Sequence, residues 1–473
     1  MKRLKKIILS FCLCFTIFAL ASCGTWSLGS MPETNATVYG NGGFAVEKGG
    51  YVYFVDSYMS ASDLGKNDNK LGKVKTCALY RTKLSNGALD LDEKGVLKSY
   101  DLVVSKVVGT QNTSLFIFDD YIYFGTPNMQ NDRTGKLRTD LIDFCRVKLD
   151  GSGMEILYTT DKYETNACYA FYKIGTSVYL VVFDGSNILK IEVTTYAKNA
   201  IKLAENVAKV VMPALPTYEY AVDNPISGTA GYVYYTRNAT TDDFVDVSNK
   251  GNVIGKVSIV DKENKQERKD GSTTYEIKSV ENTYVYAYKT VDSNKCLYAI
   301  KDFNNSTTDI QVTATSSYTN EYVLPNVSGK NLGVIVNYGN KTIWVKDGLN
   351  TSNNSTLISD GAYTIKYCDG TYAYYLNGTK MYRIDLTNTD TESNVELVFD
   401  ESNMDTNYLD FGEANYIYYF NTYTGDSGDS QKYLKRVDLT NKIQPEEDEE
   451  ETDLGYKTEL VGVLKDNHTK VEE

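Results

Sequence analysis

Short runs of aromatic and β-branched residues recur along the chain, separated by polar stretches that contain glycine. The clearest run is a tetrad with tyrosine at its first and third positions. Five copies follow this pattern: Tyr51-Val52-Tyr53-Phe54, Tyr121-Ile122-Tyr123-Phe124, Tyr232-Val233-Tyr234-Tyr235, Tyr372-Ala373-Tyr374-Tyr375 and Tyr416-Ile417-Tyr418-Tyr419. A looser copy is Tyr284-Val285-Tyr286-Ala287, and two degenerate copies are Val178-Tyr179-Leu180-Val181 and Leu332-Gly333-Val334-Ile335. Apolar residues at consecutive positions in such short runs predict strands that are covered on both faces.

A second run follows each tetrad. Four of these runs align on an arginine: residues 79–84, 144–149, 381–386 and 434–439, with the arginines at 81, 146, 383 and 436. Weaker versions lie at 188–193, 255–260, 297–301 and 342–346. In the seventh unit the two runs are joined through Asn377-Gly378, a dipeptide that favours tight hairpin turns because both residues accept positive φ. We therefore expect each tetrad and second run to be adjacent antiparallel strands, and the repeated arginines to do a repeated structural job, such as pairing with an acid in the next unit.

Two further short apolar runs flank each hairpin, for example 363–367 and 395–399 in the seventh unit. Helical periodicity is hard to find anywhere in the chain. Units of four strands at regular spacing are what a β-propeller needs. The fold class is therefore all-β, a propeller of four-stranded antiparallel blades. We read eight blades, with seven or six if a degenerate unit is an insertion. A row of β-sandwich modules is the alternative, and it requires linkers that the seven prolines do not mark.

These repeats resemble the YWTD-type propellers of the low-density lipoprotein receptor family. They resemble more closely the bacterial lipoproteins with a YWTD-like propeller domain of unknown function, which share the Tyr-x-Tyr-Tyr and Leu-Tyr-Arg-Ile-x-Leu signatures. The resemblance covers nearly all of residues 45 to 464. The chain departs from the receptor family because its tetrads lack Trp and Asp and because it has more than six units.

The N-terminus reads as an export signal. A basic head at residues 2–6 precedes the apolar run 7–21, which is too short to span a bilayer comfortably. Leu20-Ala21-Ser22-Cys23 resembles the lipobox of lipoprotein signal peptidase, which implies cleavage before Cys23 and a lipid on its sulfur. An ordinary secretory signal or an uncleaved anchor is the alternative. We expect a signal peptide at 1–22, a lipidated tether at 23–44, the propeller at 45–464 and a tail at 465–473, anchored to the membrane on the extracytoplasmic side of the cell envelope.

Charge and cysteine content limit the partners, disulfides and metal sites that we expect. The formal net charge is −13 and becomes more negative once the basic head is removed, so nucleic acid is an unsuitable partner. Five cysteines remain after Cys23: Cys77, Cys145, Cys168, Cys296 and Cys368. Their odd number and wide spacing favour buried thiols over disulfides. There is no Cys-x-x-Cys motif and only one histidine, His468, so neither a metal site nor a cofactor is assigned.

The candidate ligand face comes from the loops between second and third strands. These loops are long in units one, two, four and eight, at 57–76, 125–142, 237–252 and 421–431. Units eight, one and two become neighbours when the ring closes, so three long loops should cluster on one face. The first two loops are locally basic, and their candidate ligand-binding residues are Lys73, Lys75, Arg133, Lys136 and Arg138. The alternative is that these are ordinary solvated loops.

Catalysis has little support in the sequence, and no catalytic residue is assigned. The chain lacks a Gly-x-Ser-x-Gly elbow and zinc-ligand spacing, although a carboxylate pair for glycoside cleavage remains open. The acidic run 446–451 reads as a solvated insertion, with calcium binding as the alternative. We expect a binding or scaffolding module for a glycan, wall polymer or protein ligand. The alternatives are a surface glycosidase or lyase on the same fold and an assembly factor for envelope proteins.

Overall fold

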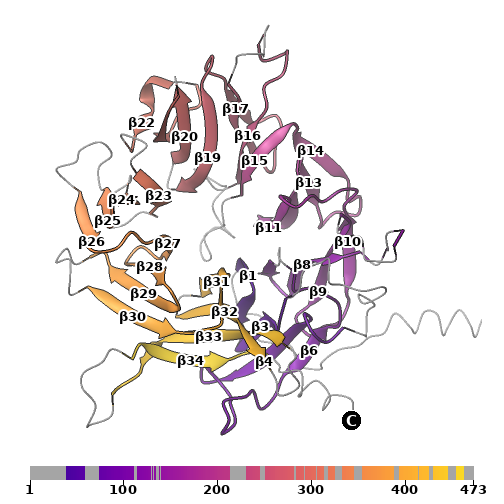
Figure 1. Cartoon of the computed structure of the whole chain (residues 1–473). Helices are drawn as coiled ribbons and strands as arrows, with labels where there is room; N and C mark the ends of the chain where they lie inside the picture. The colour runs from indigo at the N-terminus through magenta and orange to yellow at the C-terminus, as the bar shows by residue number, and fades with distance from the viewer. Residues whose placement is uncertain are drawn as a thin grey trace, which may run out of the picture.

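A computed structural model of the chain shows a ring of eight small antiparallel sheets with almost no helix (Figure 1). Each tetrad forms the second strand of a sheet and each following run forms the third, as the sequence predicts. Eight blades are therefore confirmed. The smaller blade counts and the row of sandwich modules are excluded.

The structure describes residues 39–58, 74–110, 114–128, 130, 133–134, 138, 140–212, 231–244, 251–281, 284–291, 293–304, 306–313, 318–324, 333–345, 354–387, 394–413, 415–424, 430–445 and 454–462. Within these ranges no helix is both long enough and apolar enough to cross a membrane. The signal peptide, Cys23 and the acidic run 446–451 lie outside them.

All eight blades follow one order, in which strands consecutive in the chain lie side by side from the innermost strand to the outermost. Blade one contains β2 (Ala45–Lys48), β3 (Tyr51–Val55), β4 (Leu79–Ser85) and β6 (Asp101–Val104), and the short β5 (Ala88–Leu89) also pairs with β4. Blade two contains β7 (Leu115–Phe118), β8 (Tyr121–Pro127), β9 (Ile142–Lys148) and β10 (Glu155–Thr159). Blade three contains β11 (Cys168–Ile174), β12 (Ser177–Phe183), β13 (Ile188–Glu192) and β14 (Ala200–Ala204). Blade four contains β15 (Val207–Val211), β16 (Tyr232–Arg237), β17 (Val253–Ser258) and β18 (Lys265–Arg268).

The second half of the ring repeats this order. Blade five contains β19 (Thr274–Glu281), β20 (Tyr284–Val291), β21 (Asn294–Ile300) and β22 (Ile310–Gln311), with the 3-10 turn η2 (Ser306–Thr308) before β22. Blade six contains β23 (Tyr318–Val323), β24 (Val334–Tyr338), β25 (Lys341–Val345) and β26 (Ser355–Ile358). Blade seven contains β27 (Ile365–Cys368), β28 (Tyr372–Asn377), β29 (Lys380–Asp385) and β30 (Val395–Asp400). Blade eight contains β31 (Met404–Glu413), β32 (Tyr416–Thr424), β33 (Ser430–Lys442) and β34 (Tyr456–Leu460).

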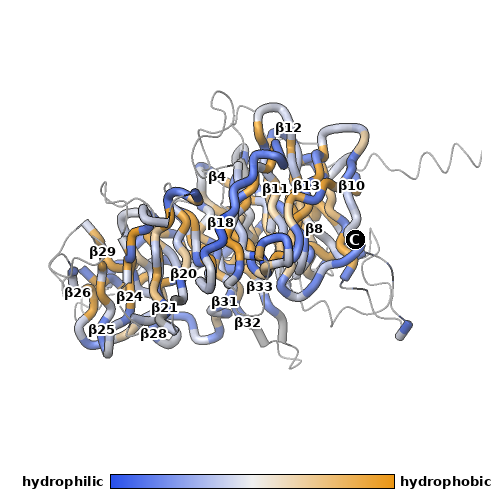
Figure 2. Tube along the Cα trace, turned by 90° about the horizontal axis from the view of Figure 1, so that it is seen from above, coloured by the Kyte–Doolittle hydropathy of each residue, from blue (hydrophilic) through white to orange (hydrophobic). Residues whose placement is uncertain are grey.

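The core is divided among the interfaces between blades. The described residues form eight clusters of buried apolar side chains, and each cluster joins two neighbouring blades. Figure 2 shows the apolar strands within the ring and the polar segments at its surface. Burial of apolar surface stabilises a fold by roughly 25 cal/mol per Å². Closure of the ring therefore stabilises the fold, because it buries the apolar side chains on both faces of each blade. This explains why the tetrads are apolar at consecutive positions.

The repeated arginines do a structural job within their own blades. Arg436 lies 4.0 Å from the ring centre of Tyr416, the first tetrad residue, and its Nη2 is 2.9 Å from Glu459 in the fourth strand. The same three-part contact occurs in four blades: Tyr51–Arg81–Asp101, Tyr121–Arg146–Glu155, Tyr372–Arg383–Glu396 and Tyr416–Arg436–Glu459. The acid common to all four contacts belongs to the same blade, so the expectation of an acid in the next blade is met only by Arg436, which also lies 3.2 Å from Glu47 of blade one.

Three boundaries differ from the sequence reading. Asn377 pairs with Lys380, so the turn is centred on Gly378-Thr379, and only Gly378 has positive φ. The predicted loop 421–431 is mostly strand, since β32 and β33 stay paired up to Thr424 and Ser430. The last strand covers 456–460, not 459–464.

One strand was not indicated by the sequence. β1 (Tyr39–Gly43) pairs antiparallel with β7, the innermost strand of blade two, and also lies beside β31 of blade eight. A Cβ on Gly43 would lie 1.9 Å from a carboxylate oxygen of Asp410, so only glycine permits this approach. Because β1 is rich in glycine, it lacks the apolar pattern from which the other strands were predicted.

Antiparallel strand order gives the ring two distinct faces. Connections from second to third strands and from one blade to the next emerge on one side, which we call the long-loop face. Connections from first to second and from third to fourth strands emerge on the other side, which we call the short-turn face. The described candidate ligand residues Lys75, Arg133 and Arg138 lie between second and third strands and so belong to the long-loop face.

Candidate functional site at the junction of blades eight and one

The structure brings the strand ends that flank the predicted loops of blades eight, one and two to one sector of the long-loop face. One apolar cluster joins blade eight to blade one through Phe420 and Phe54, and another joins blade one to blade two through Val55 and Phe124. These blades are therefore consecutive in the ring, as expected. Their second-to-third loops emerge side by side on the long-loop face.

Three of the five predicted ligand residues lie in the described part of the chain. Arg133 is exposed. Arg138 is ion-paired with Asp140, and its Nε lies 2.9 Å from the Asp140 carboxylate, so its charge is already matched. Lys75 is half-buried, and its main-chain carbonyl accepts a hydrogen bond from Tyr80. Lys73 and Lys136 lie outside the described residues.

The sequence missed a polar cluster at the junction of blades eight and one. Tyr58, at the start of the long loop of blade one, donates a hydrogen bond to the carboxylate of Asp405. Lys432, at the start of the third strand of blade eight, lies with its Nζ 3.1 Å from the same carboxylate and 3.9 Å from the centre of the Tyr58 ring. Lys432 also donates a hydrogen bond to the Tyr58 hydroxyl. We call Tyr58, Asp405, Lys432 and the adjacent Tyr408 the junction cluster.

Two aromatic rings pack against the ring of Tyr58 and hold the junction cluster in place. The ring of Tyr58 lies 4.2 Å from that of Tyr408 and 4.9 Å from that of Phe420, measured between ring centres. Tyr58 itself is only 7% exposed. The Lys432 and Asp405 side chains keep 36% and 20% of their surface exposed, so an amine and a carboxylate face the solvent over a rigid aromatic base.

The electrostatics of the junction cluster keep it charged. Burial alone would raise the pKa of Asp405, but the hydrogen bonds from Tyr58 and Lys432 lower it below its ordinary value. Burial raises the pKa of Tyr58, and its hydrogen bond to Asp405 raises it further. At neutral pH Asp405 is therefore a carboxylate and Tyr58 a neutral phenol.

A second carboxyl group lies beneath the same junction. Asp56 is fully buried, and burial raises the pKa of its carboxyl well above the ordinary value. Its main-chain carbonyl accepts the N–H of Leu434 in blade eight at 3.2 Å. This hydrogen bond holds the main chain of blade one against blade eight two residues before Tyr58.

The chemistry of the junction cluster suits recognition of a polar ligand. The Lys432 amine donates, the Asp405 carboxylate accepts, and the half-buried ring of Tyr408 offers apolar contact. Sequence reasoning missed these residues because Tyr58 and Asp405 are 347 positions apart. The available signal was the tyrosine at the mouth of a predicted long loop, but it is one of 40 tyrosines in the chain.

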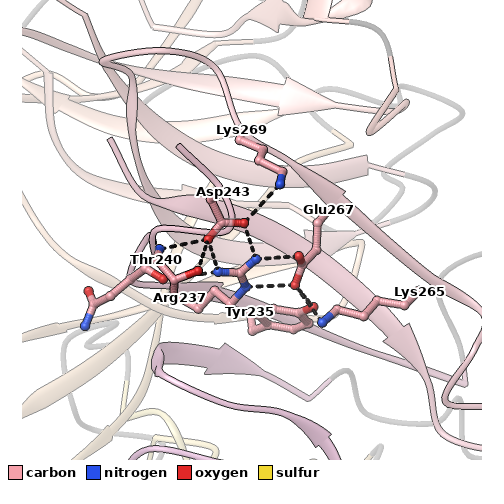
Figure 3. A network of polar contacts seen from close by, with 8 residues as sticks. Tyr235, Arg237, Thr240, Asp243, Lys265, Glu267 and Lys269 are labelled. Carbon is pink, nitrogen blue, oxygen red and sulfur yellow. Dashed lines mark hydrogen bonds and ion pairs between the residues drawn. The ribbon is translucent and has the colours of Figure 1, made fainter. Parts of the chain in front are cut away.

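The long loop of blade four is held by a different network (Figure 3). Arg237 lies between Asp243 and Glu267, with its guanidinium nitrogens 2.6 Å from each carboxylate. Lys269 and Lys265 bind the outer sides of these acids at 3.0 and 2.9 Å. Burial alone would raise the pKa of Glu267, but the hydrogen bonds from Arg237 and Lys265 lower it to about 2. Since Arg237 and Asp243 are almost fully buried, this network fixes the loop.

Comparison with known proteins adds the fold only. No protein-family model matches the chain, and no curated protein matches it. Among solved structures, a prolyl endopeptidase, from work on inter-domain dynamics in catalysis and specificity, has a TM-score of 0.40 and 10% identity. The match covers 90% of this chain and 57% of the endopeptidase chain, so this chain spans little more than half of that protein.

Two archaeal structures give similar values. The β-propeller domain of the Trilobed protease from Pyrococcus furiosus has a TM-score of 0.39 and 8% identity, over 68% of this chain and 92% of that domain. The acylaminoacyl peptidase of Pyrococcus horikoshii has a TM-score of 0.36 and 9% identity, over 66% of this chain and 48% of the peptidase. Such similarity carries no argument about function. The chain is an eight-bladed β-propeller of four-stranded antiparallel sheets.

Proposed function

We propose that this protein is a lipid-anchored propeller of the cell envelope that binds or scaffolds an extracytoplasmic ligand at the long-loop face of blades eight, one and two. The lipobox ending at Cys23 supports the anchor. In four blades the second tyrosine of the tetrad pairs in register with the arginine of the third strand. This repeated pairing supports the resemblance to YWTD-like propellers. Rigid blades that carry long loops are a common way to build a binding surface.

The junction cluster is the observation that carries the proposal. It joins two blades whose long loops are neighbours, and it holds an ammonium group and a carboxylate at a fixed distance on an aromatic base. Exposed Arg133 on blade two adds a cationic group in the same sector. This combination favours a ligand rich in hydroxyl groups that also carries negative charge, such as an anionic glycan or wall polymer.

A binding assay with a matched variant tests the proposal. The soluble chain that starts after Cys23 is applied to an array of purified envelope glycans, including anionic wall polymers and neutral polysaccharides. We expect retention of anionic glycans by the unsubstituted chain and its loss in Lys432→Met, which keeps the stem of the side chain and removes the charge. Reversing Arg133 to Glu should weaken binding further.

Lys295→Met is the matched control. Lys295 also lies over a tyrosine, 4.3 Å from the ring centre of Tyr288, and is ion-paired with Glu276 at 2.7 Å, but it belongs to blade five. Equal loss of binding in both variants would contradict the site, and unchanged binding in both would do the same. Release of cleaved glycan from the array would instead favour the glycosidase or lyase, and Asp405→Asn would then be the variant to assay.

A further inference from the structure

The first described residue of the chain lies at the short-turn face. β1 runs antiparallel to β7, and its first residue Tyr39 is opposite Ile117, next to the turn from β7 to β8. Gly43, at the other end of β1, is opposite Leu115 at the start of β7. The chain therefore enters the ring from the short-turn face and runs toward the long-loop face.

Exposed apolar side chains gather at this same face. Within the described residues, seven large hydrophobic side chains are exposed: Ile156, Tyr196, Ile201, Val260, Tyr338, Ile443 and Leu454. Six of them lie on turns between third and fourth strands, or at the strand ends beside these turns. Tyr338 is the exception, because it ends the second strand of blade six on the long-loop face.

Tyr196 is the most prominent member of the group. It lies on the turn between β13 and β14, and its side chain is fully exposed, at 105% of the reference value. Ile201 lies at the start of β14 in the same blade, at 41%. Ile156 begins the outer strand of neighbouring blade two at 51%, and the two blades are tied there by the ion pair of Lys198 with Glu155. Blades two and three thus both carry exposed apolar side chains on their short-turn side, where an ion pair joins them.

We propose that the short-turn face lies against the surface of a lipid bilayer, with Tyr196 and its apolar neighbours in the interface, so that the long-loop face points away from the membrane. The choice of a bilayer rests on the anchor at Cys23 proposed above. The stretch from Cys23 to Tyr39 reaches at most about 55 Å when fully extended, so the anchor keeps this face near the membrane. Tyrosine suits the interfacial region because its ring is apolar and its hydroxyl is polar.

The tether and the apolar rim support the same orientation independently. A tether attached at the short-turn face would bring that face to the membrane even if its surface were polar. Exposed apolar side chains would favour membrane contact by that face even without a tether, because their removal from water is favourable. Ligands in the surrounding space would then meet the long-loop face unobstructed.

Quenching by brominated lipid tests this orientation. Two variants of the full, lipidated protein are compared, Tyr196→Trp and Tyr338→Trp. Each is reconstituted with phosphatidylcholine vesicles that contain brominated phosphatidylcholine. The unsubstituted protein gives the background from Trp26 and Trp344. Tyr196 is fully exposed and Tyr338 is 50% exposed, so neither substitution disturbs the core. We expect a loss of emission from the indole at position 196 and none from that at position 338.

The outcomes separate this inference from the anchor. Three results in protein that floats with the vesicles would overturn the orientation. They are equal quenching at positions 196 and 338, quenching at position 338 alone, and quenching at neither position. Failure of the protein to float would contradict the anchor. In that case the two indoles are compared in Cys23→Ala protein with the same vesicles, where quenching at 196 alone supports the lipid-facing surface and any other result overturns it.

Discussion

The carboxylate of Asp410, in the innermost strand of blade eight, accepts the main-chain N–H of Phe44 at 2.6 Å. It also accepts the N–H of Ala45, at 3.2 Å, so one side chain caps the start of blade one across 366 residues of chain. Blade eight consists of C-terminal strands and blade one of N-terminal strands. Among the described residues the ring is therefore closed by side-chain contacts, the apolar cluster at this junction and the main-chain hydrogen bond from Leu434 to Asp56, without a strand exchanged between its ends.

Asp410→Ala should destabilise the ring at this junction. The main-chain N–H groups of Phe44, Ala45 and Gly412 would lose their acceptor, and each buried N–H left unpaired costs about 1–3 kcal/mol. Asp410→Asn keeps a carbonyl oxygen and should lose less. Urea unfolding followed by the fluorescence of Trp344 measures both changes. Asp369→Ala is the control, because Asp369 also accepts two N–H groups but in an exposed turn where water replaces it. An equal loss in the control would contradict this account of closure.

The repeated arginines should differ in their importance. Arg436 is 1% exposed and lies between Glu459 at 2.9 Å and Glu47 of blade one at 3.2 Å. Arg436→Met would remove the cation that Glu47 and Glu459 share and leave Glu459 with Lys457 alone, and removing one partner of a buried pair costs about 3–5 kcal/mol. The side chain of Arg146 is 23% exposed, and Arg146→Met should cost about 1 kcal/mol. Similar unfolding midpoints for the two variants would show that burial does not set the difference.

The sequence predicted the parts of the fold that repeat. Tetrads such as 121–124 identified the second strands because the same side chains must fit the same space between blades eight times. β1 (Tyr39–Gly43) escaped because it occurs once and has no apolar pattern. The junction cluster escaped for a different reason, since Asp405 and Tyr58 meet only when the ring closes. Counting basic residues in the loops gave Arg138, whose charge the structure shows to be matched by Asp140.

The thiols of the described residues should react slowly in the folded chain, in an order set by their burial. Burial raises the pKa of Cys145 and Cys368 to about 12 and that of Cys168 to about 11, so the reactive thiolate is scarce at neutral pH. Cys168 is the only partly exposed member, so it should react first. Labelling with Ellman's reagent in the soluble chain that starts after Cys23, with and without guanidinium, measures this order. Cys168→Ser should remove the fastest phase, and rapid labelling of all thiols in the native protein would contradict the packing.

Glu281, at the end of the innermost strand of blade five, should make stability depend on pH. Burial raises the pKa of its carboxyl from 4.5 to about 7. Below the lower value the group is protonated in both states and has no effect. As pH rises toward 7, the unfolded chain releases the proton while the folded chain retains it, so the folded state loses stability, by at most about 3 kcal/mol.

Glu281→Gln should therefore raise the free energy of unfolding near pH 8 and leave it unchanged near pH 4. Urea titrations at both pH values measure this free energy. Glu263→Gln, at a side chain 81% exposed, is the control. A gain of equal size at both pH values would mean that packing, and not the proton, accounts for the change.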